Sequence, residues 1–282
     1  MHLTRTFLWQ VLRDAFGHFY SDDGWAFASH ITLSGLMALF PFLIFATSLA
    51  SFLGANAFAD TAVHVIFDTW PSTIARPIAD EVRNVLSVRR GGLLTVSVLA
   101  AAYFASNGIE ALRIALNRAY RVTDTRSVIF CRLQSLGFVI VATLVLTAIS
   151  ILLVLAPLGV RIAEHWFPAI APYTGSLTIW RYAIAIAVLI LGLLVVHLWL
   201  PAGRRGFLDI LPGIGVTLLA WLVGSIVFAK YLETFANYVS TYAGLASIMV
   251  AIVFLYIVAA IFILGAEINA AILHYRGARR SD

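Results

Sequence analysis

Six long apolar stretches, free of acidic residues and lysine, constrain this chain more than any motif does. Arg181 is the only charged residue inside them. A helix of about 20 residues crosses a hydrocarbon layer about 30 Å thick, and each stretch is close to that length. The sequence therefore predicts an all-α polytopic membrane protein, a bundle of six transmembrane helices. The predicted spans are residues 25–54, 91–109, 133–156, 179–200, 210–229 and 244–266.

Composition agrees with a membrane protein. Hydrophobic residues make up 61% of the chain and charged residues 12%, whereas a typical soluble domain has about 25% charged residues. The net charge of +5 is what arginine clusters beside membrane spans produce, so no nucleic-acid partner is predicted. The single cysteine, Cys131, excludes an internal disulfide and a cysteine-based zinc site.

The distribution of basic residues predicts the orientation. Of the 19 Lys and Arg residues, 12 lie in the two termini and in the connections after the second and fourth spans, which share one side of the membrane. Because basic residues accumulate on the cytoplasmic side, both termini are predicted to be cytoplasmic. The pair Arg89-Arg90 beside the second span is a local exception.

The segments outside the spans complete a single membrane domain over residues 1–282. Residues 1–24 carry apolar side chains at helical spacing opposite Arg5, Arg13 and Asp14, which predicts an amphipathic helix on the inner leaflet. A disordered tail is the alternative. Residues 55–90 are too polar to span and are predicted to form short amphipathic helices on the outer face.

Ionisable and amide side chains at the inner ends of two spans are the candidate functional residues. Such groups are costly at membrane depth, which makes them candidates for substrate or proton handling. A structural ion pair with Arg113 or Arg276, or a hydrogen bond at the helix end, is the alternative for the two glutamates. The candidates are Glu110, Glu267, Asn107, Asn269, Arg113, Arg118, Arg121 and His30, with Tyr238 and Tyr242 in an outer loop.

Simpler interpretations compete with several of these candidates. His30 fits an interhelical hydrogen bond, and the tyrosines fit an ordinary aromatic belt. His197, beside Trp199, is interpreted as an interfacial anchor. No nucleotide-binding loop, zinc-protease or serine-hydrolase motif is present, and the histidines are dispersed. The sequence predicts no catalytic residue, no metal site and no cofactor, so any transport would be passive or driven by an ion gradient.

Several motifs resemble the YihY/BrkB family of bacterial inner-membrane proteins. They include Ala38-Leu39-Phe40-Pro41 in the first span, residues 115–122 after the second, and Leu211-Pro212-Gly213 in the fifth. The most specific are residues 238–244 and the helix end at 265–269. The resemblance covers residues 20–275 and implies six transmembrane helices in the inner membrane, with no settled activity. The ribonuclease BN label of some members finds no support in the arrangement of acidic residues here.

The leading hypothesis is a transporter or translocator of a lipid, a lipid-linked precursor or another envelope amphiphile, working without nucleotide hydrolysis. Membrane lipids, including those with anionic headgroups, are the expected partners. Whether the protein forms a homo-oligomer is left open. In this hypothesis the two glutamates handle protons or cations, while Arg113, Arg118 and Arg121 attract phosphate. The alternatives are a structural or scaffolding membrane protein and, less favoured, a membrane-associated nuclease.

Overall fold

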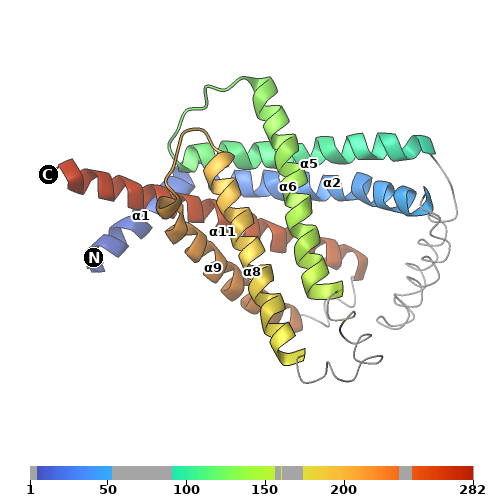
Figure 1. Ribbon diagram of the computed structural model, residues 1–282. Helices are drawn as coiled ribbons and strands as arrows, with labels where there is room; N and C mark the ends of the chain where they lie inside the picture. Colours follow the sequence, from blue (N-terminus) through green and yellow to red (C-terminus); the bar gives the residue numbers. More distant parts are fainter. Residues whose placement is uncertain (1–4, 53–90, 156–159, 161–173, 235–242, 282) are drawn as a thin grey trace. The chain divides into compact units, whose positions relative to one another are not determined.

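The computed structural model describes residues 5–52, 91–155, 160, 174–234 and 243–281 (Figure 1). Within these ranges every regular element is helical and no strand is present. The predicted outer segment, residues 55–90, lies outside the described residues, as do Tyr238 and Tyr242. The elements are α1 (Arg5–Ser21), α2 (Gly24–Phe52), α5 (Gly91–Ala119), α6 (Val128–Ser150), a π-helical turn (Ile151–Leu155), α8 (Thr174–Trp199), α9 (Phe207–Thr234) and α11 (Ala243–Ser281).

Four of the described helices are long and apolar enough to cross a membrane: Val128–Leu153, Gly175–Trp199, Phe207–Leu232 and Met249–Arg276. They contain most of the third to sixth predicted spans. In the most apolar stretch of Val128–Leu153 only 6% of the residues are buried. The protein itself therefore does not cover these apolar side chains, which is typical of a helix that faces lipid. The chain is an all-α membrane protein, as predicted.

The first two predicted spans also lie in helices. Both α2 and α5 have 29 residues, and α2 runs through Pro41 as one element. Neither is among the four helices that meet the length and apolarity criterion within the described part. Helix formation is therefore confirmed for both segments, whereas the total of six spans stays a prediction.

The contacts divide the chain into two compact units, one of residues 1–32 with 108–282 and the other of residues 33–107. The smaller unit holds most of α2 and the first part of α5. Its α5 part contains a local hydrogen bond, in which Ser106 Oγ donates to the Tyr103 carbonyl oxygen at 2.8 Å. The larger unit holds the remaining helices.

Within the larger unit, α11 packs against both α1 and α9. One face of α1 buries Phe7, Val11 and Ala15 against Ile268 and Ala271 of α11. This confirms a helix in the N-terminal segment and excludes a disordered tail for the described residues 5–21. The opposite face of α1 leaves large apolar side chains exposed, namely Leu8, Trp9, Leu12, Phe16 and Tyr20.

Two glycines allow α9 and α11 to approach closely. A Cβ atom on Gly213 would overlap the carbonyl oxygen of Gly265, and one on Gly265 would overlap Thr217 Oγ1. Small residues at such a crossing let two helix backbones meet, which is the usual arrangement in membrane bundles. The crossing fixes the part of α11 that carries Glu267 and Asn269.

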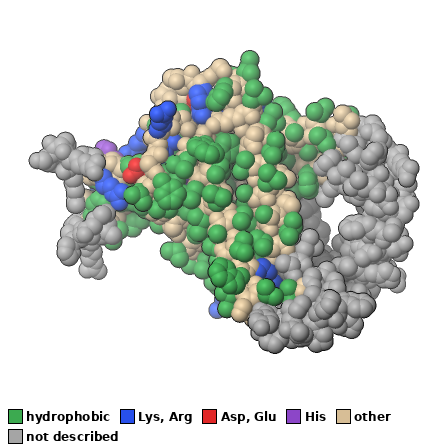
Figure 2. All heavy atoms as spheres, viewed as in Figure 1, with side chains coloured by type: hydrophobic (Ala, Val, Ile, Leu, Met, Phe, Trp, Pro, Cys, Tyr) green, Lys and Arg blue, Asp and Glu red, His purple; other side chains and the backbone are tan. Residues whose placement is uncertain are grey.

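The outer surface of α6, α8 and α9 is apolar. Figure 2 shows hydrophobic side chains over much of the face in view, with Lys and Arg side chains gathered in a few places. Exposed apolar residues on these helices include Ile140, Leu144, Ile179, Leu219 and Leu222. An apolar surface of this extent is typical of helices that face lipid.

Candidate functional site

Buried polar side chains of the larger unit gather where α5 ends, α6 begins and the α8–α9 connection lies. They come from α5, α6, α8, α9 and α11. The buried members are Arg113, Asn117, Ser135, His197, Thr217, Glu267 and Asn269. Buried polar groups normally have partners, so the pairing of each one indicates whether it holds the fold together or is available for chemistry.

Arg113 bridges two carboxylates. Its guanidinium donates to both oxygens of Glu110 and to Asp124 Oδ2, and the Nε–Glu110 Oε2 distance is 3.2 Å. Ser135 Oγ donates a further hydrogen bond to Glu110 Oε2 at 2.9 Å. Of the alternatives for Glu110, the structural ion pair with Arg113 is therefore present.

Asp124 is the centre of this network. It accepts hydrogen bonds from Arg126 Nε and Nη2, both at 2.8 Å, and from Asn117 Nδ2 at 3.0 Å. The Arg126 guanidinium, with the Arg126 backbone N–H, holds the pKa of the Asp124 carboxyl well below its usual range. Asp124 is thus ionised at neutral pH. We name the set Glu110, Arg113, Asn117, Asp124 and Arg126 the α5–α6 network.

The α5–α6 network also anchors the end of α8. Asn117 Oδ1 accepts from the Ala202 backbone N–H at 2.7 Å, and Arg126 Nη2 donates to the Leu200 carbonyl oxygen at 3.1 Å. Gln134 Nε2 donates to the Trp199 carbonyl oxygen at 2.6 Å. Two of these bonds satisfy carbonyl groups at the C-terminus of α8, and the third satisfies the Ala202 N–H that follows it. The network therefore has a structural role.

A second chain of hydrogen bonds crosses the core. Asn269 Nδ2 donates to the Tyr120 hydroxyl at 3.2 Å, and the hydroxyl lies 2.8 Å from His197 Nδ1. Asn269 Oδ1 accepts from the Gly213 backbone N–H at 2.6 Å. His197 is fully buried, so its interpretation as an interfacial anchor is wrong. Burial raises the pKa of Tyr120 to about 12, which keeps its hydroxyl neutral at physiological pH.

Replacing Tyr120 with phenylalanine is expected to lower the free energy of unfolding by about 2 kcal/mol, because it leaves two buried polar side chains without their partner. Thermal unfolding of the purified protein in detergent measures the loss. Tyr20→Phe is the matched control, since Tyr20 is 78% exposed and the change should be neutral. Equal melting temperatures for wild type and Tyr120→Phe would contradict the hydrogen bonds assigned to the Tyr120 hydroxyl.

Glu267 differs from Glu110 and Asp124, whose carboxylates are both paired with arginine. It is 1% exposed on α11, and its Oε2 atom has no hydrogen-bond partner among the described residues. The charged groups that act on it electrostatically are Asp22, Arg121 and Asp14, from α1 and the connections after α1 and α5. Arg276, the other proposed partner, instead lies 3.9 Å from Asp209. Glu110 and Glu267 have no hydrogen-bond partner in common within the described ranges.

Arg118 and Arg121 pair with acids from α1 and its connection to α2. Arg118 Nη1 lies 3.1 Å from Asp23 Oδ2, and Arg121 Nη2 lies 2.6 Å from Asp14 Oδ2. Asp23 (φ 58°) and Arg121 (φ 57°) are the two non-glycine residues with positive φ in the described chain. Both adopt a conformation that L residues rarely adopt, and each contributes one side chain to these pairs.

The remaining predicted residues do not join these clusters. His30 is exposed on α2, and Asn107 is half-buried on the α5 part of the smaller unit. The sequence interpretation missed Tyr120, His197 and Asp124 as members of polar clusters. Asp124 offered a signal, being an acidic residue in a connection that is otherwise basic. Tyr120 and His197 are 77 residues apart, and no local pattern links them.

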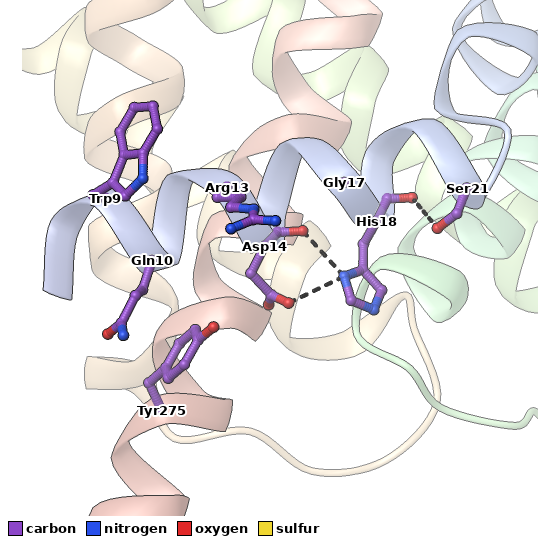
Figure 3. Close-up of a pocket in the computed structure, with 8 residues that line it drawn as sticks. All are labelled: Trp9, Gln10, Arg13, Asp14, Gly17, His18, Ser21 and Tyr275. Carbon is purple, nitrogen blue, oxygen red and sulfur yellow. Dashed lines mark hydrogen bonds and ion pairs between the residues drawn. The ribbon is translucent and has the colours of Figure 1, made fainter. Parts of the chain in front are cut away.

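Among the described residues of the larger unit, two cavities lie beside these polar clusters. One, of about 550 Å³, lies along α1 and against Tyr275 of α11 (Figure 3). Figure 3 shows His18 Nδ1 directed at Asp14, from which it is 3.3 Å away at Oδ1. The other cavity, of about 800 Å³, lies between the start of α6 and the α8–α9 connection. No group of three His, Cys, Asp or Glu side chains suited to a metal ion occurs within the described residues.

Comparison with known proteins identifies the family. The family described as virulence factor BrkB matches residues 15–282. The chain belongs to the BrkB family. One relative, YfkH of Bacillus subtilis, carries a name that calls it ribonuclease-like. It is 30% identical, with 94% of this chain and 95% of YfkH aligned.

A second relative, the UPF0761 membrane protein RC1_0578 of Rhodospirillum centenum, is 27% identical. The alignment covers 95% of this chain and 59% of the relative. No solved structure matches the chain. The family assignment confirms the resemblance predicted from the sequence motifs and agrees with a membrane protein.

Proposed function

We propose that this protein is a translocator of a lipid, a lipid-linked precursor or another amphiphile in the bacterial inner membrane. It works without nucleotide hydrolysis and catalyses no covalent chemistry. In this proposal α2 and α5 complete a bundle of six spans, and the bias of basic residues places both termini in the cytoplasm. Helix α1 lies at the inner membrane surface, where its exposed Leu8, Trp9 and Phe16 contact lipid.

The observation that carries the proposal is the burial of Glu267 with one oxygen unpartnered. Burying a carboxyl group without its hydrogen bonds costs stability, and an apolar residue of similar size would avoid that cost. Intramembrane acidic groups retained at such a cost commonly bind protons, cations or polar substrate groups. Glu267 also lies within electrostatic reach of the Asp14–Arg121 pair, which supplies a second charged element for a gate.

Lipid scrambling in liposomes tests the proposal. Liposomes carry fluorescent phospholipid in both leaflets, and a membrane-impermeant quencher reports how fast inner-leaflet lipid becomes accessible. Wild type is expected to exchange lipid faster than protein-free liposomes do. The Glu267→Gln variant is expected to lower that rate at least about tenfold, while its thermal stability is unchanged or raised. Asp209→Asn is the control, because Asp209 is partly exposed in a long 3.9 Å pair with Arg276.

A scaffolding role is the second candidate, favoured by the α5–α6 network, whose members are all bound to one another or to backbone. For a scaffold, Glu267→Gln lowers thermal stability and leaves no separable functional defect. Wild-type liposomes that exchange lipid no faster than empty ones would remove the support for translocation. The ribonuclease-like name of YfkH describes that relative, and the proposal assigns this chain no such activity.

A further inference from the structure

The 800 Å³ cavity between α6 and the α8–α9 connection has an unusual charge balance. Its lining includes three arginines, Arg126, Arg204 and Arg205, and no acidic residue. Asp124, which does not line the cavity, neutralises the charge of Arg126 through two hydrogen bonds of 2.8 Å. Arg204 is exposed and forms no ion pair with any described residue. The cavity therefore carries an excess of positive charge.

Arg205 lies against the ring of Tyr120. Its guanidinium lies 4.0 Å above the ring centroid of Tyr120, and Nη2 donates to the Ala202 carbonyl oxygen at 2.6 Å. Its Nη1 atom is buried and has no hydrogen-bond partner among the described residues. Burial lowers the pKa of the Arg205 guanidinium, which nevertheless stays charged at physiological pH. A half-buried guanidinium that is not paired with a carboxylate is matched by an anion that accepts hydrogen bonds.

The cavity lies at the ends of three membrane helices. The candidate spans begin at Val128 and Phe207 and end at Trp199. Phe130 and Trp199 line the cavity and are 52% and 67% exposed. Exposed aromatic residues beside guanidinium groups at span ends are typical of the headgroup region of a bilayer. A lipid bound at this depth would place its charged group in the cavity and its apolar part along α6 and α8.

We propose that this cavity binds the phosphate-bearing headgroup of an anionic phospholipid, held by Arg204 and Arg205. The three arginines favoured for this role by the sequence are less suited, because Arg113, Arg118 and Arg121 are each paired with carboxylates. A lipid is a better fit than free phosphate, because the exposed apolar surface of α6 and α8 is continuous with the rim. The site does not depend on translocation, and a protein that only scaffolds the membrane could hold the same lipid.

Native mass spectrometry of the full-length protein tests the site. Protein in mixed micelles is offered equal amounts of phosphatidylglycerol and phosphatidylcholine, and the ratio of retained lipids is measured. Wild type should prefer phosphatidylglycerol. In the double variant Arg204→Gln/Arg205→Gln, the ratio of retained phosphatidylglycerol to phosphatidylcholine should fall about thirtyfold. Arg118→Gln removes one exposed arginine elsewhere at this end of the unit, and should leave the ratio unchanged.

Three results would overturn the proposal. An equal loss with Arg118→Gln would show attraction to general surface charge. Displacement of the lipid by millimolar inorganic phosphate, with no preference between the two lipids, would show a phosphate site. If the double variant fails to fold, Arg204→Gln decides alone, because its side chain is exposed and unpaired: about a fivefold loss of preference supports the site, and an unchanged ratio overturns it.

Discussion

Replacing Gly213 with alanine is expected to destabilise the protein by about 3 kcal/mol or more. The added Cβ atom would overlap the Gly265 carbonyl oxygen and lie 2.5 Å from Asn269 Nδ2. Both neighbours are fixed, one as helix backbone and the other by its hydrogen bonds to Gly213 and Tyr120. Helices α9 and α11 must separate to accommodate the methyl group.

Gly215 provides a matched control on the same helix. A Cβ atom there would meet nothing within 4 Å, and alanine has a helix propensity about 1 kcal/mol better than that of glycine. Gly215→Ala should therefore be neutral or slightly stabilising. The melting temperatures of both variants are measured in detergent, with the loss of monodisperse protein on heating as the signal for unfolding. A Gly213→Ala variant as stable as Gly215→Ala would contradict the close crossing of α9 and α11.

The helices could be predicted because their signal is local. An apolar run of about 20 residues is visible without any knowledge of neighbours, and all six predicted segments lie partly or wholly in helices. The predicted span bounds do not indicate where the helices end. Helix α11 continues to Ser281, well beyond residue 266, because its last part packs Ile268 and Ala271 against α1. Tertiary packing of this kind has no signature in hydropathy.

The candidate site was predictable only where its contacts are local. The Glu110–Arg113 pair joins residues three apart on one helix face, which the sequence alone indicates. The partners of Arg118 and Arg121 lie 95 and 107 residues away, so these arginines were assigned to phosphate instead of to Asp23 and Asp14. The missing information was the packing of α1 onto α11, which brings its acidic residues to the end of α5.

Replacing Asp124 with asparagine is expected to lower the free energy of unfolding by about 3 kcal/mol at neutral pH. The change leaves two arginines, Arg113 and Arg126, without their shared carboxylate in a site where the Asp124 side chain is 14% exposed. Asp23→Asn is the control. The side chains of Asp23 and Arg118 are 68% and 46% exposed, so the loss of unfolding free energy should stay below about 1 kcal/mol. Asparagine also tolerates the positive φ at this position.

The effect of Asp124→Asn should also depend on pH. Because the pKa of Asp124 is lowered in the folded protein, its ionisation stabilises the fold at any pH above the ordinary carboxyl pKa of about 4. That stabilisation is lost progressively as the pH falls below about 4, towards the pKa of the folded state. The difference in melting temperature between wild type and Asp124→Asn should therefore be constant from pH 7 to about 5 and shrink at lower pH. A difference that does not change down to pH 3 would mean that shape, and not charge, makes Asp124 the centre of the α5–α6 network.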